Sequence, residues 1–205
     1  MSNRVRYDRA AMSPVQLSFL ELLPEGFEYR AELVSPDEEA DLLKHFRKLD
    51  LREFEFHGFL GKRRVISFGQ HYDFAAETLH NAEEIPGFLL PLRQRAADFA
   101  QIAASDLPHA LVTEYAPCAA IGWHRDRPVY KDVIGVSFAS PCRFRLRRKR
   151  GSAWQRASKV LEPRSVYLLR GPVRTQWQHS IPPVEHWRYS VTFGSLNPAA
   201  NPDAL

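Results

Sequence analysis

The stretch Gly122-Trp123-His124-Arg125-Asp126-Arg127 is the part of the sequence from which the fold and the chemistry are best inferred. On a strand or at a strand end, His124 and Asp126 project to the same side, because alternate residues share a face. With a third histidine from a distant strand they would form a two-histidine, one-carboxylate facial triad. Such a triad suits Fe(II) and leaves coordination positions open for oxygen chemistry. A histidine and an aspartate two positions apart are common by chance, so this hypothesis needs a third ligand and an anchor for a cosubstrate.

His179 is the candidate for the third ligand and lies in the alternating sequence Arg174-Thr-Gln-Trp-Gln-His179-Ser180. It follows Asp126 by 53 positions, which is enough chain for several strands and a return to the opposite side of a barrel mouth. A single histidine is more often structural than a metal ligand. A zinc hydrolase could also use His, Asp and His, but it would leave Arg188 without a role.

Arg188 begins the last strand-like segment, residues 188–193 (RYSVTF). Alternation predicts that Arg188 and Ser190 share one face of this strand and that Tyr189 and Val191 share the other. An arginine that points into a barrel is costly unless it meets an anion. A dicarboxylate cosubstrate would satisfy it through bidentate hydrogen bonds.

Three blocks of the sequence together resemble the AlkB family of Fe(II)/2-oxoglutarate dioxygenases, closely over residues 109–195 and loosely in the front half. The blocks are Y-x-P-x(6)-H-x-D, R-x-x-W-x-H-x-I-P and R-Y-S-x-T-F. The matching residues are Tyr115, Pro117, His124 and Asp126; Arg174, Trp177, His179, Ile181 and Pro182; and Arg188 to Phe193.

The resemblance implies a site and a reaction. By matching position, the implied iron ligands are His124, Asp126 and His179, and the implied cosubstrate-binding residues are Arg188, Tyr115, Ser190 and Thr113. Arg188 would hold the distal carboxylate of 2-oxoglutarate, and O2 would be the second cosubstrate. The implied reaction is oxidative demethylation of an N-alkylated base in DNA or RNA, with release of formaldehyde.

Three positions depart from the family's pattern. Gly194 stands where relatives have a second arginine, so either cosubstrate binding is weaker or another cation such as Arg174 or Arg145 substitutes. On this basis, Gly194→Arg is expected to tighten the cosubstrate. Thr113 stands where many relatives have asparagine. Pro128 replaces an acidic residue that meets the target base in the bacterial repair enzyme, so the base preference of that enzyme does not carry over.

Two further functions stay open. The same chemistry could act on a protein side chain or a small molecule. Alternatively, the chain could be a turnover-impaired binding module, because Gly194 replaces the second arginine.

Composition is typical of a globular protein. The 205 residues are 44% hydrophobic and 25% charged, and the net charge of +4 permits nucleic-acid binding without requiring it. Two cysteines, Cys118 and Cys142, lie far apart, so neither a disulfide framework nor a structural zinc site is expected. The sequence has no apolar run long enough for a membrane span and no pattern of a signal peptide, so a cytoplasmic location is expected.

The expected fold class is α+β, a double-stranded β-helix (jelly roll) with N-terminal helices packed on its sheet. We expect a loose basic arm over 1–20, one dioxygenase domain over 21–197 with its metal and cosubstrate core at about 109–195, and a loose tail over 198–205. The arm could instead contact nucleic acid through Arg4, Arg6 and Arg9. No feature of the sequence indicates the oligomeric state.

The expected elements start with a turn at residues 24–26 and a short strand after it. A helix from the capping serine Ser35 to about Leu49 and a second helix over 91–105 follow. Strands are expected near 109–116, 133–140, 142–149, 153–161, 164–170, 174–180 and 187–195.

Two segments mix basic and aromatic residues and are candidates for substrate contact, since aromatics stack bases and cations hold phosphates. The candidates are Lys62, Arg63, Arg64, Phe68, His71 and Tyr72 in the first segment, and Arg143 and Arg145 in the run 143–150 (RFRLRRKR). In both segments a solvated hairpin with no such role is the alternative.

Overall fold

The computed structural model describes residues 23–197, apart from 57–58, 74–77 and 82. The predicted arm (1–20) and tail (198–205) lie outside the described residues. The predicted turn at 24–26 is present, since Phe27 N donates to Pro24 O at 2.9 Å. Gly26 takes a positive φ of 84° there, which glycine adopts without steric cost, and strand β1 follows at once.

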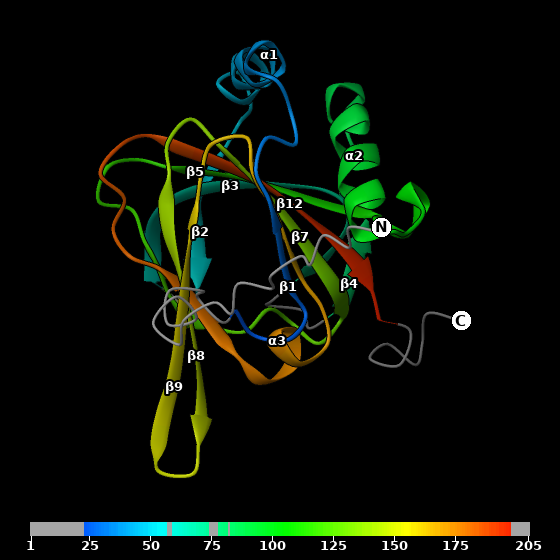
Figure 1. Ribbon diagram of the computed structural model, residues 1–205. Helices are drawn as coiled ribbons and strands as arrows, with labels where there is room; N and C mark the ends of the chain where they lie inside the picture. The colour runs from blue at the N-terminus through cyan, green and yellow to red at the C-terminus, as the bar shows by residue number, and fades with distance from the viewer. Residues whose placement is uncertain (1–22, 57–58, 74–77, 82, 198–205) are drawn as a thin grey trace, which may run out of the picture.

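Two antiparallel sheets make up the core (Figure 1). The large sheet has the order β1 (Phe27–Arg30), β10 (Val166–Leu169), β7 (Tyr130–Phe138), β12 (Arg188–Leu196), β5 (His109–Tyr115), β3 (Phe59–Asp73) and β2 (Arg52–Phe56), and β4 (Thr78–Asn81) pairs with β3. The small sheet has the order β6 (Ile121–His124), β11 (Gln178–Ile181), β8 (Cys142–Arg150) and β9 (Ala153–Leu161). This arrangement confirms the predicted jelly-roll core.

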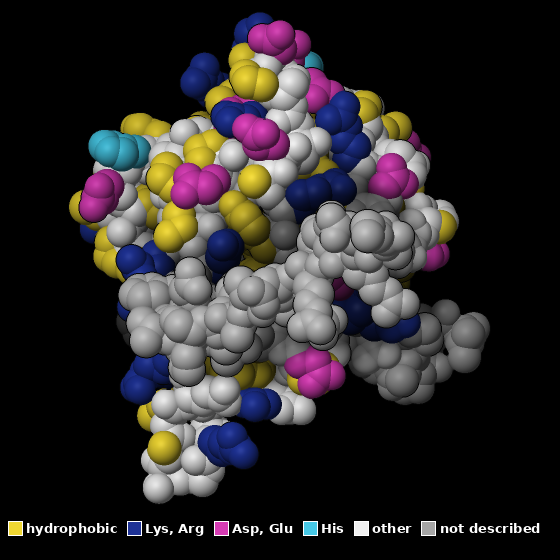
Figure 2. Space-filling model, in the orientation of Figure 1, with side chains coloured by type: hydrophobic (Ala, Val, Ile, Leu, Met, Phe, Trp, Pro, Cys, Tyr) yellow, Lys and Arg dark blue, Asp and Glu magenta, His cyan; other side chains and the backbone are white. Residues whose placement is uncertain are grey.

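Two helices cover the face of the large sheet that points away from the small sheet (Figure 1). Helix α1 (Pro36–Phe46) starts at the predicted capping box: Glu38 N donates to Ser35 Oγ and Ser35 N donates to Glu38 Oε2. Helix α2 (Leu90–Ala100) follows the short 3-10 helix η2 (Gly87–Leu89). At this end of the molecule the exposed cations and carboxylates are mixed (Figure 2).

Two hydrophobic clusters lie on the two sides of the large sheet. The first fills the space under the helices, where the Phe46 ring of α1 lies 5.4 Å from Phe138 of β7 and 5.8 Å from Tyr189 of β12. The second lies between the two sheets and includes Phe144 and Leu146 of β8.

Strand β12 alternates between these two sides as predicted. Tyr189 and Val191 belong to the cluster under the helices. Arg188 and Ser190, both buried, therefore face the space between the sheets. The side chains of Arg188 and Ser190 thus bring polar groups into the interior between the two sheets.

The structure corrects two predicted elements and adds two strands. Residues 172–176 form helix α3 (Pro172–Gln176), which starts with proline at its first position, so the predicted strand 174–180 begins only at Gln178. Helix α2 ends at Ala100 because Gln101 takes a left-handed conformation, and only the 3-10 helix η3 (Ala104–Asp106) lies beyond it. Strands β4 and β6 were not among the predicted strands. Within the described residues, no helix has the length and apolar character to cross a membrane.

Candidate active site

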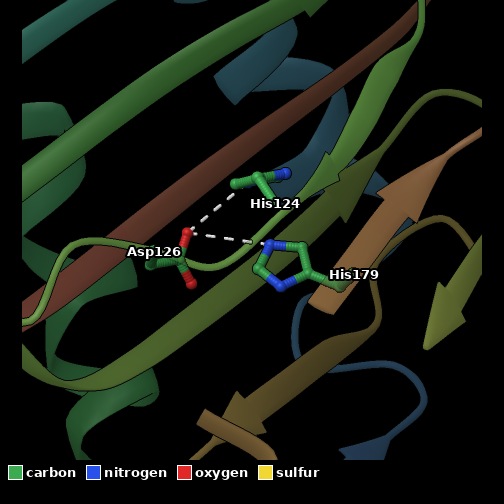
Figure 3. A group of neighbouring side chains, drawn as sticks. All are labelled: His124, Asp126 and His179. Atoms are coloured by element: carbon green, nitrogen blue, oxygen red, sulfur yellow. Dashed lines mark ion pairs between the residues drawn. The ribbon is translucent and has the colours of Figure 1, made fainter. Parts of the chain in front are cut away.

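Three residues on the small sheet and its connecting loop form the one group of potential metal ligands found among the described residues (Figure 3). His124 ends β6 and pairs in register with His179 of β11, and Asp126 follows two positions later. One ligand atom from each residue lies within 4.8 Å of the other two. Asp126 Oδ1 is 3.7 Å from His124 Nε2 and 3.6 Å from His179 Nε2. The structure therefore brings the three predicted ligands together.

The electrostatics of this group suit a divalent cation. Burial raises the pKa of Asp126, but the charges of His179, His124 and Arg174 outweigh this effect and lower it. Burial lowers the pKa of His179 to about 4. At neutral pH the site therefore contains a carboxylate and a neutral imidazole, which are the forms that bind metal. Asp126 Oδ2 is buried without a hydrogen-bond partner within the described part of the chain, and a bound cation would compensate it.

The ligand side chains are held by their surroundings. His124 Nδ1 lies 3.0 Å from Gly122 O, so Nε2 is the nitrogen on the side of Asp126. The ring of Phe144 stacks against His179 with centroids 5.1 Å apart. Imidazole, imidazole and carboxylate in this arrangement fit Fe(II).

Arg174 of α3 fixes the loop that carries Asp126. It is buried, and its Nη1 donates to Asp126 O at 3.0 Å. Its Nη2 donates to Tyr130 O at 2.9 Å and also to Arg127 O. One guanidinium thus bridges three backbone carbonyls of the loop.

Arg188 lies between the sheets with hydrogen-bonding capacity left over. It is 1% exposed, its Nη2 donates to Ser137 Oγ at 2.7 Å, and its guanidinium carbon lies 4.6 Å from the ring centroid of Tyr115. Within the described residues, Nε and Nη1 have no hydrogen-bond partner. Unpaired buried donors are costly, and a carboxylate that accepts from one of them would also balance the buried charge. These donors fit the distal carboxylate of 2-oxoglutarate.

The other predicted cosubstrate residues surround this arginine. Tyr115 pairs with Arg188 in register, and Ser190 pairs with Thr113 on one side and Ser137 on the other. All of them are buried.

Tyr167 of β10 was missed by the sequence reasoning. Its ring occupies the space of a side chain at Gly135, where an added Cβ would lie 2.3 Å from ring atoms. Burial raises the pKa of its hydroxyl, and the charges of Asp126 and Tyr115 raise it further, so the hydroxyl stays protonated. The Tyr167 ring lies 4.9 Å from that of Phe144, which in turn stacks against His179. Neither the cross-strand register nor the gap at Gly135 can be read from the local sequence.

Gly194 lies in β12 beside Tyr130. A Cβ at Gly194 would lie 2.7 Å from Tyr130 Cδ1, and the Tyr130 ring stacks against His109 with centroids 4.9 Å apart. An aromatic pair thus lies where a side chain at position 194 would extend. Of the two candidate substitute cations, Arg174 lies beside Asp126, whereas Arg145 donates to Ser180 Oγ at 3.0 Å on the small sheet.

The predicted substrate residues are scattered. Phe68 is 2% exposed in the cluster under the helices, so its ring is part of the core and not of a binding surface. Arg64 pairs with Glu114 at 2.6 Å. Lys62 is exposed and Arg63 half-buried on β3. The side chains of His71 and Tyr72 lie outside the described residues, as part of β3 whose backbone alone is described. Arg143 and Arg145 lie on β8.

Comparisons with known proteins agree with this geometry. Residues 30–195 match the model of a family described as the 2OG-Fe(II) oxygenase superfamily. The chain is 28% identical over 193 residues to a protein of Arabidopsis thaliana named "Alkylated DNA repair protein ALKBH8 homolog". The alignment covers 82% of this chain and 54% of that protein. The chain therefore spans about half the length of this curated relative.

Two solved structures share the fold. The structure of OsALKBH1 aligns with a TM-score of 0.66 at 16% identity, over 84% of this chain and 98% of that one. A Pseudomonas putida prolyl-4-hydroxylase aligns with a TM-score of 0.56 at 13% identity, over 84% and 93% of the two chains. Both similarities concern the jelly-roll fold alone.

Proposed function

The chain belongs to the 2OG-Fe(II) oxygenase superfamily, and on that basis we propose that it removes alkyl groups oxidatively from nitrogen atoms of a base in DNA or RNA. Enzymes of this superfamily use Fe(II), with 2-oxoglutarate and O2 as cosubstrates, so the protein is an iron-dependent dioxygenase.

The observation that carries the proposal is the grouping of His124, Asp126 and His179 within 4.8 Å. In this proposal the three side chains hold the iron. Bound Fe(II), together with 2-oxoglutarate and O2, supplies the oxidant for a substrate C–H bond, and succinate and CO2 leave as coproducts. On an N-methyl group this oxidation gives a hydroxymethyl product that falls apart into the free base and formaldehyde.

The remaining residues bind, orient and exclude water. Arg188 takes the distal carboxylate through a donor nitrogen that has no partner among the described residues, while Ser137 and Tyr115 keep its guanidinium in place. Tyr167 offers a neutral hydroxyl near the metal group. Because these groups are buried, water competes little for the cosubstrate and the charge–charge interactions are strong.

Arg174 supplies the positive charge that relatives have in the arginine at the position of Gly194. It lies beside Asp126 and lowers the pKa of that carboxyl group, along with the stronger effects of the two histidines. A role in closing the site around the carboxylate ligand therefore does not require an arginine at position 194.

Two features support a nucleic-acid substrate. The name of the Arabidopsis relative refers to repair of alkylated DNA, and the small sheet of this chain carries a strongly basic hairpin. The same oxidation of a protein side chain or a small molecule is the alternative, because the metal and cosubstrate groups would be the same. A turnover-impaired binding module is the second alternative, because Gly194 replaces the second arginine of the family.

One experiment separates these possibilities. The protein is first titrated with Fe(II) and 2-oxoglutarate without oxygen, and succinate and formaldehyde are then measured in air. The substrates are a methylated oligonucleotide and its unmethylated counterpart, and His179→Ala is the metal-site control. Succinate and formaldehyde that both require the methyl group support the proposal. Succinate release that no nucleic acid stimulates contradicts the base substrate, and binding without succinate supports the impaired module.

A further inference from the structure

The hairpin of β8 and β9 projects from the body of the molecule and is strongly basic (Figure 1). Residues 142–161 contain eight Lys and Arg residues and no Asp or Glu. The cations are Arg143, Arg145, Arg147, Arg148, Lys149, Arg150, Arg156 and Lys159. The charged side chains in view on this hairpin are all basic, unlike those at the helical end (Figure 2).

Cations and indoles share one face of the small sheet. On β8, Phe144 and Leu146 pack into the cluster between the sheets, and Leu146 pairs in register with His179. Arg145 and Arg147 alternate with them, so they lie on the outer face, opposite the metal group. We call this surface the outer face; its members are Trp123, Arg143, Arg145, Arg147, Lys149, Trp154, Arg156 and Ser158.

Arg147 lies between two indole rings. Its guanidinium carbon is 4.3 Å from the ring centroid of Trp123 and 4.5 Å from that of Trp154, and the guanidinium carbon of Arg145 is 5.0 Å from Trp123. Arg147 Nε donates to Gln178 Oε1 at 2.8 Å, and Arg145 uses its Nε in the bond to Ser180. Both bonds use Nε, so with respect to the described part of the chain the Nη nitrogens of these two arginines stay available for a ligand.

The outer face has no carboxylates to balance its charge. Arg147 pairs directly with Arg156 across the hairpin, and like charges in opposed positions destabilise a sheet. Elsewhere, some half-buried arginines pair with carboxylates, as Arg170 does with Asp132 at 3.0 Å. None of the ion pairs found among the described residues involves the hairpin. A bound polyanion would remove this repulsion.

We propose that the outer face binds the backbone of a single-stranded nucleic acid, as an anchoring surface separate from the catalytic pocket. Its link to catalysis rests on the proposed function. A groove of about 630 Å³ between Trp123, Arg143, Arg145 and Arg156 offers room at this surface for a nucleotide. Indole rings interleaved with cations suit unpaired bases and their phosphates, whereas base-paired DNA hides the ring faces. An anionic membrane would instead need a continuous apolar face, which the outer face lacks.

The test measures binding of a labelled, unmethylated single strand by fluorescence anisotropy over a range of salt concentrations. Its length is on the order of 10 nucleotides. In Arg147→Gln/Arg156→Gln we expect affinity to fall about tenfold or more and the slope of log K against log salt to drop by roughly 1.4. This variant also removes the opposed like charges, so the fold should be retained. Trp154→Ala should weaken binding roughly tenfold at every salt concentration.

The matched control is Lys44→Gln/Arg52→Gln, which removes two exposed cations outside the hairpin. Equal losses in the two double variants would overturn the proposal, since net charge alone would then explain the binding. Binding of vesicles of phosphatidylserine in preference to the oligonucleotide would overturn it as well.

A kinetic arm separates this inference from the proposed function. In the hairpin variant, the KM for a methylated oligonucleotide should rise more than the KM for the methylated nucleoside. If no methylated base is turned over but the single strand still binds through the hairpin, the proposed function fails and the anchoring surface stands. If demethylation occurs and the hairpin variants bind like the control, the anchoring surface fails alone.

Discussion

Substitution of Arg188 should affect cosubstrate binding and the free energy of unfolding in different ways. Its Nε and Nη1 are buried without partners among the described residues, so the folded protein carries an unfavourable desolvation at this position. An apolar side chain of similar size would remove that cost. We therefore attribute this residue to the proposed ligand binding and not to folding.

For Arg188→Met we expect 2-oxoglutarate binding to weaken about 100-fold or more, because the proposed charged partner of the distal carboxylate is lost. The free energy of unfolding should stay equal or rise by about 1 kcal/mol, since replacing a buried charge by an apolar group is often neutral or stabilising. Anaerobic cosubstrate titration and urea unfolding measure the two effects. The matched control is Arg170→Met, which strands the buried Asp132 and should cost about 2 kcal/mol. A similar loss of stability in both variants would contradict this account of Arg188.

For Gly194→Arg the structure replaces the expectation of tighter cosubstrate binding with one of steric conflict. The new Cβ would lie 2.7 Å from Tyr130 Cδ1, so we expect a loss of about 1–3 kcal/mol from overpacking. Tyr130→Ala combined with Gly194→Arg should recover part of this loss. Urea unfolding of the single and double variants measures it, and an unchanged stability of the single variant would show that the Tyr130 ring moves aside at little cost.

Tyr189 gives a pH-dependent contribution to stability. Burial, the hydrogen bond to Glu114 at 2.7 Å and the charge of that carboxylate raise the pKa of Tyr189 to about 12. In the unfolded chain this pKa is about 10. Because the folded-state pKa is the higher one, the stabilisation is fully present below pH 10 and is lost as the pH rises through 12. Relative to Tyr189→Phe, the wild type should be more stable by about 2 kcal/mol below pH 10, and the difference should shrink between pH 10 and 12. A difference that is constant up to pH 12 in urea unfolding would refute this.

At the level of elements, the short helix α3 links two of the proposed metal ligands to each other. It precedes β11, which carries His179, and its Arg174 binds the loop that carries Asp126. Two ligands on separate segments are thus positioned by one element.

In Arg174→Gln the loop loses a guanidinium that bonds three carbonyls, so we expect metal affinity to fall about 10- to 100-fold, as for other groups that hold ligands in place. Anaerobic titration with Co(II), followed by its absorption spectrum, measures the affinity without turnover. The matched control is Arg125→Gln, whose exposed side chain bonds Thr175 O alone, and its affinity should change little. Equal affinities in the two variants would show that the loop is held by other contacts.

The elements also explain which parts of the site the sequence could predict. The alternation of β12 was predictable because Arg188 and Tyr189 need opposite surroundings. It is confirmed because Tyr189 packs in the cluster under the helices, whereas Arg188 does not. The helix α3 was not, because five residues are too few to show a helical period and the sequence alternates like a strand. Tyr167 was not, because its place depends on a glycine in another strand. Local sequence patterns predict on which face of a strand a residue lies. They do not predict its neighbours on adjacent strands, because these depend on the register of strand pairing.

On the scale of the whole molecule, the proposed metal ligands and the proposed cosubstrate anchor belong to different sheets. His124 and His179 lie in the small sheet, and Arg188 lies in the large sheet. A ligand held by both groups would connect the sheets.

Metal and cosubstrate together should therefore stabilise the fold more than either does alone. With Mn(II) and 2-oxoglutarate each at about 100 times its Kd, without oxygen, each contributes about 2.7 kcal/mol if it binds independently, and any excess reports their coupling. Thermal unfolding with each ligand singly and with both measures this. In Arg188→Met the 2-oxoglutarate increment should disappear and the metal increment should remain. A 2-oxoglutarate increment that survives in this variant would place the cosubstrate elsewhere.

The division of the site between two sheets has a mechanical consequence. The spacing between the two sheets sets the distance from the metal group to Arg188. A change of about 1 Å in the position of a reacting group is enough to cost about 100-fold in rate. Heating or pressure that loosens the packing of Phe144 and Leu146 against the large sheet would then stop catalysis while both sheets are still folded. The catalytic rate therefore reports on the spacing between the sheets. On heating, it should fall at a lower temperature than the one at which the sheets unfold.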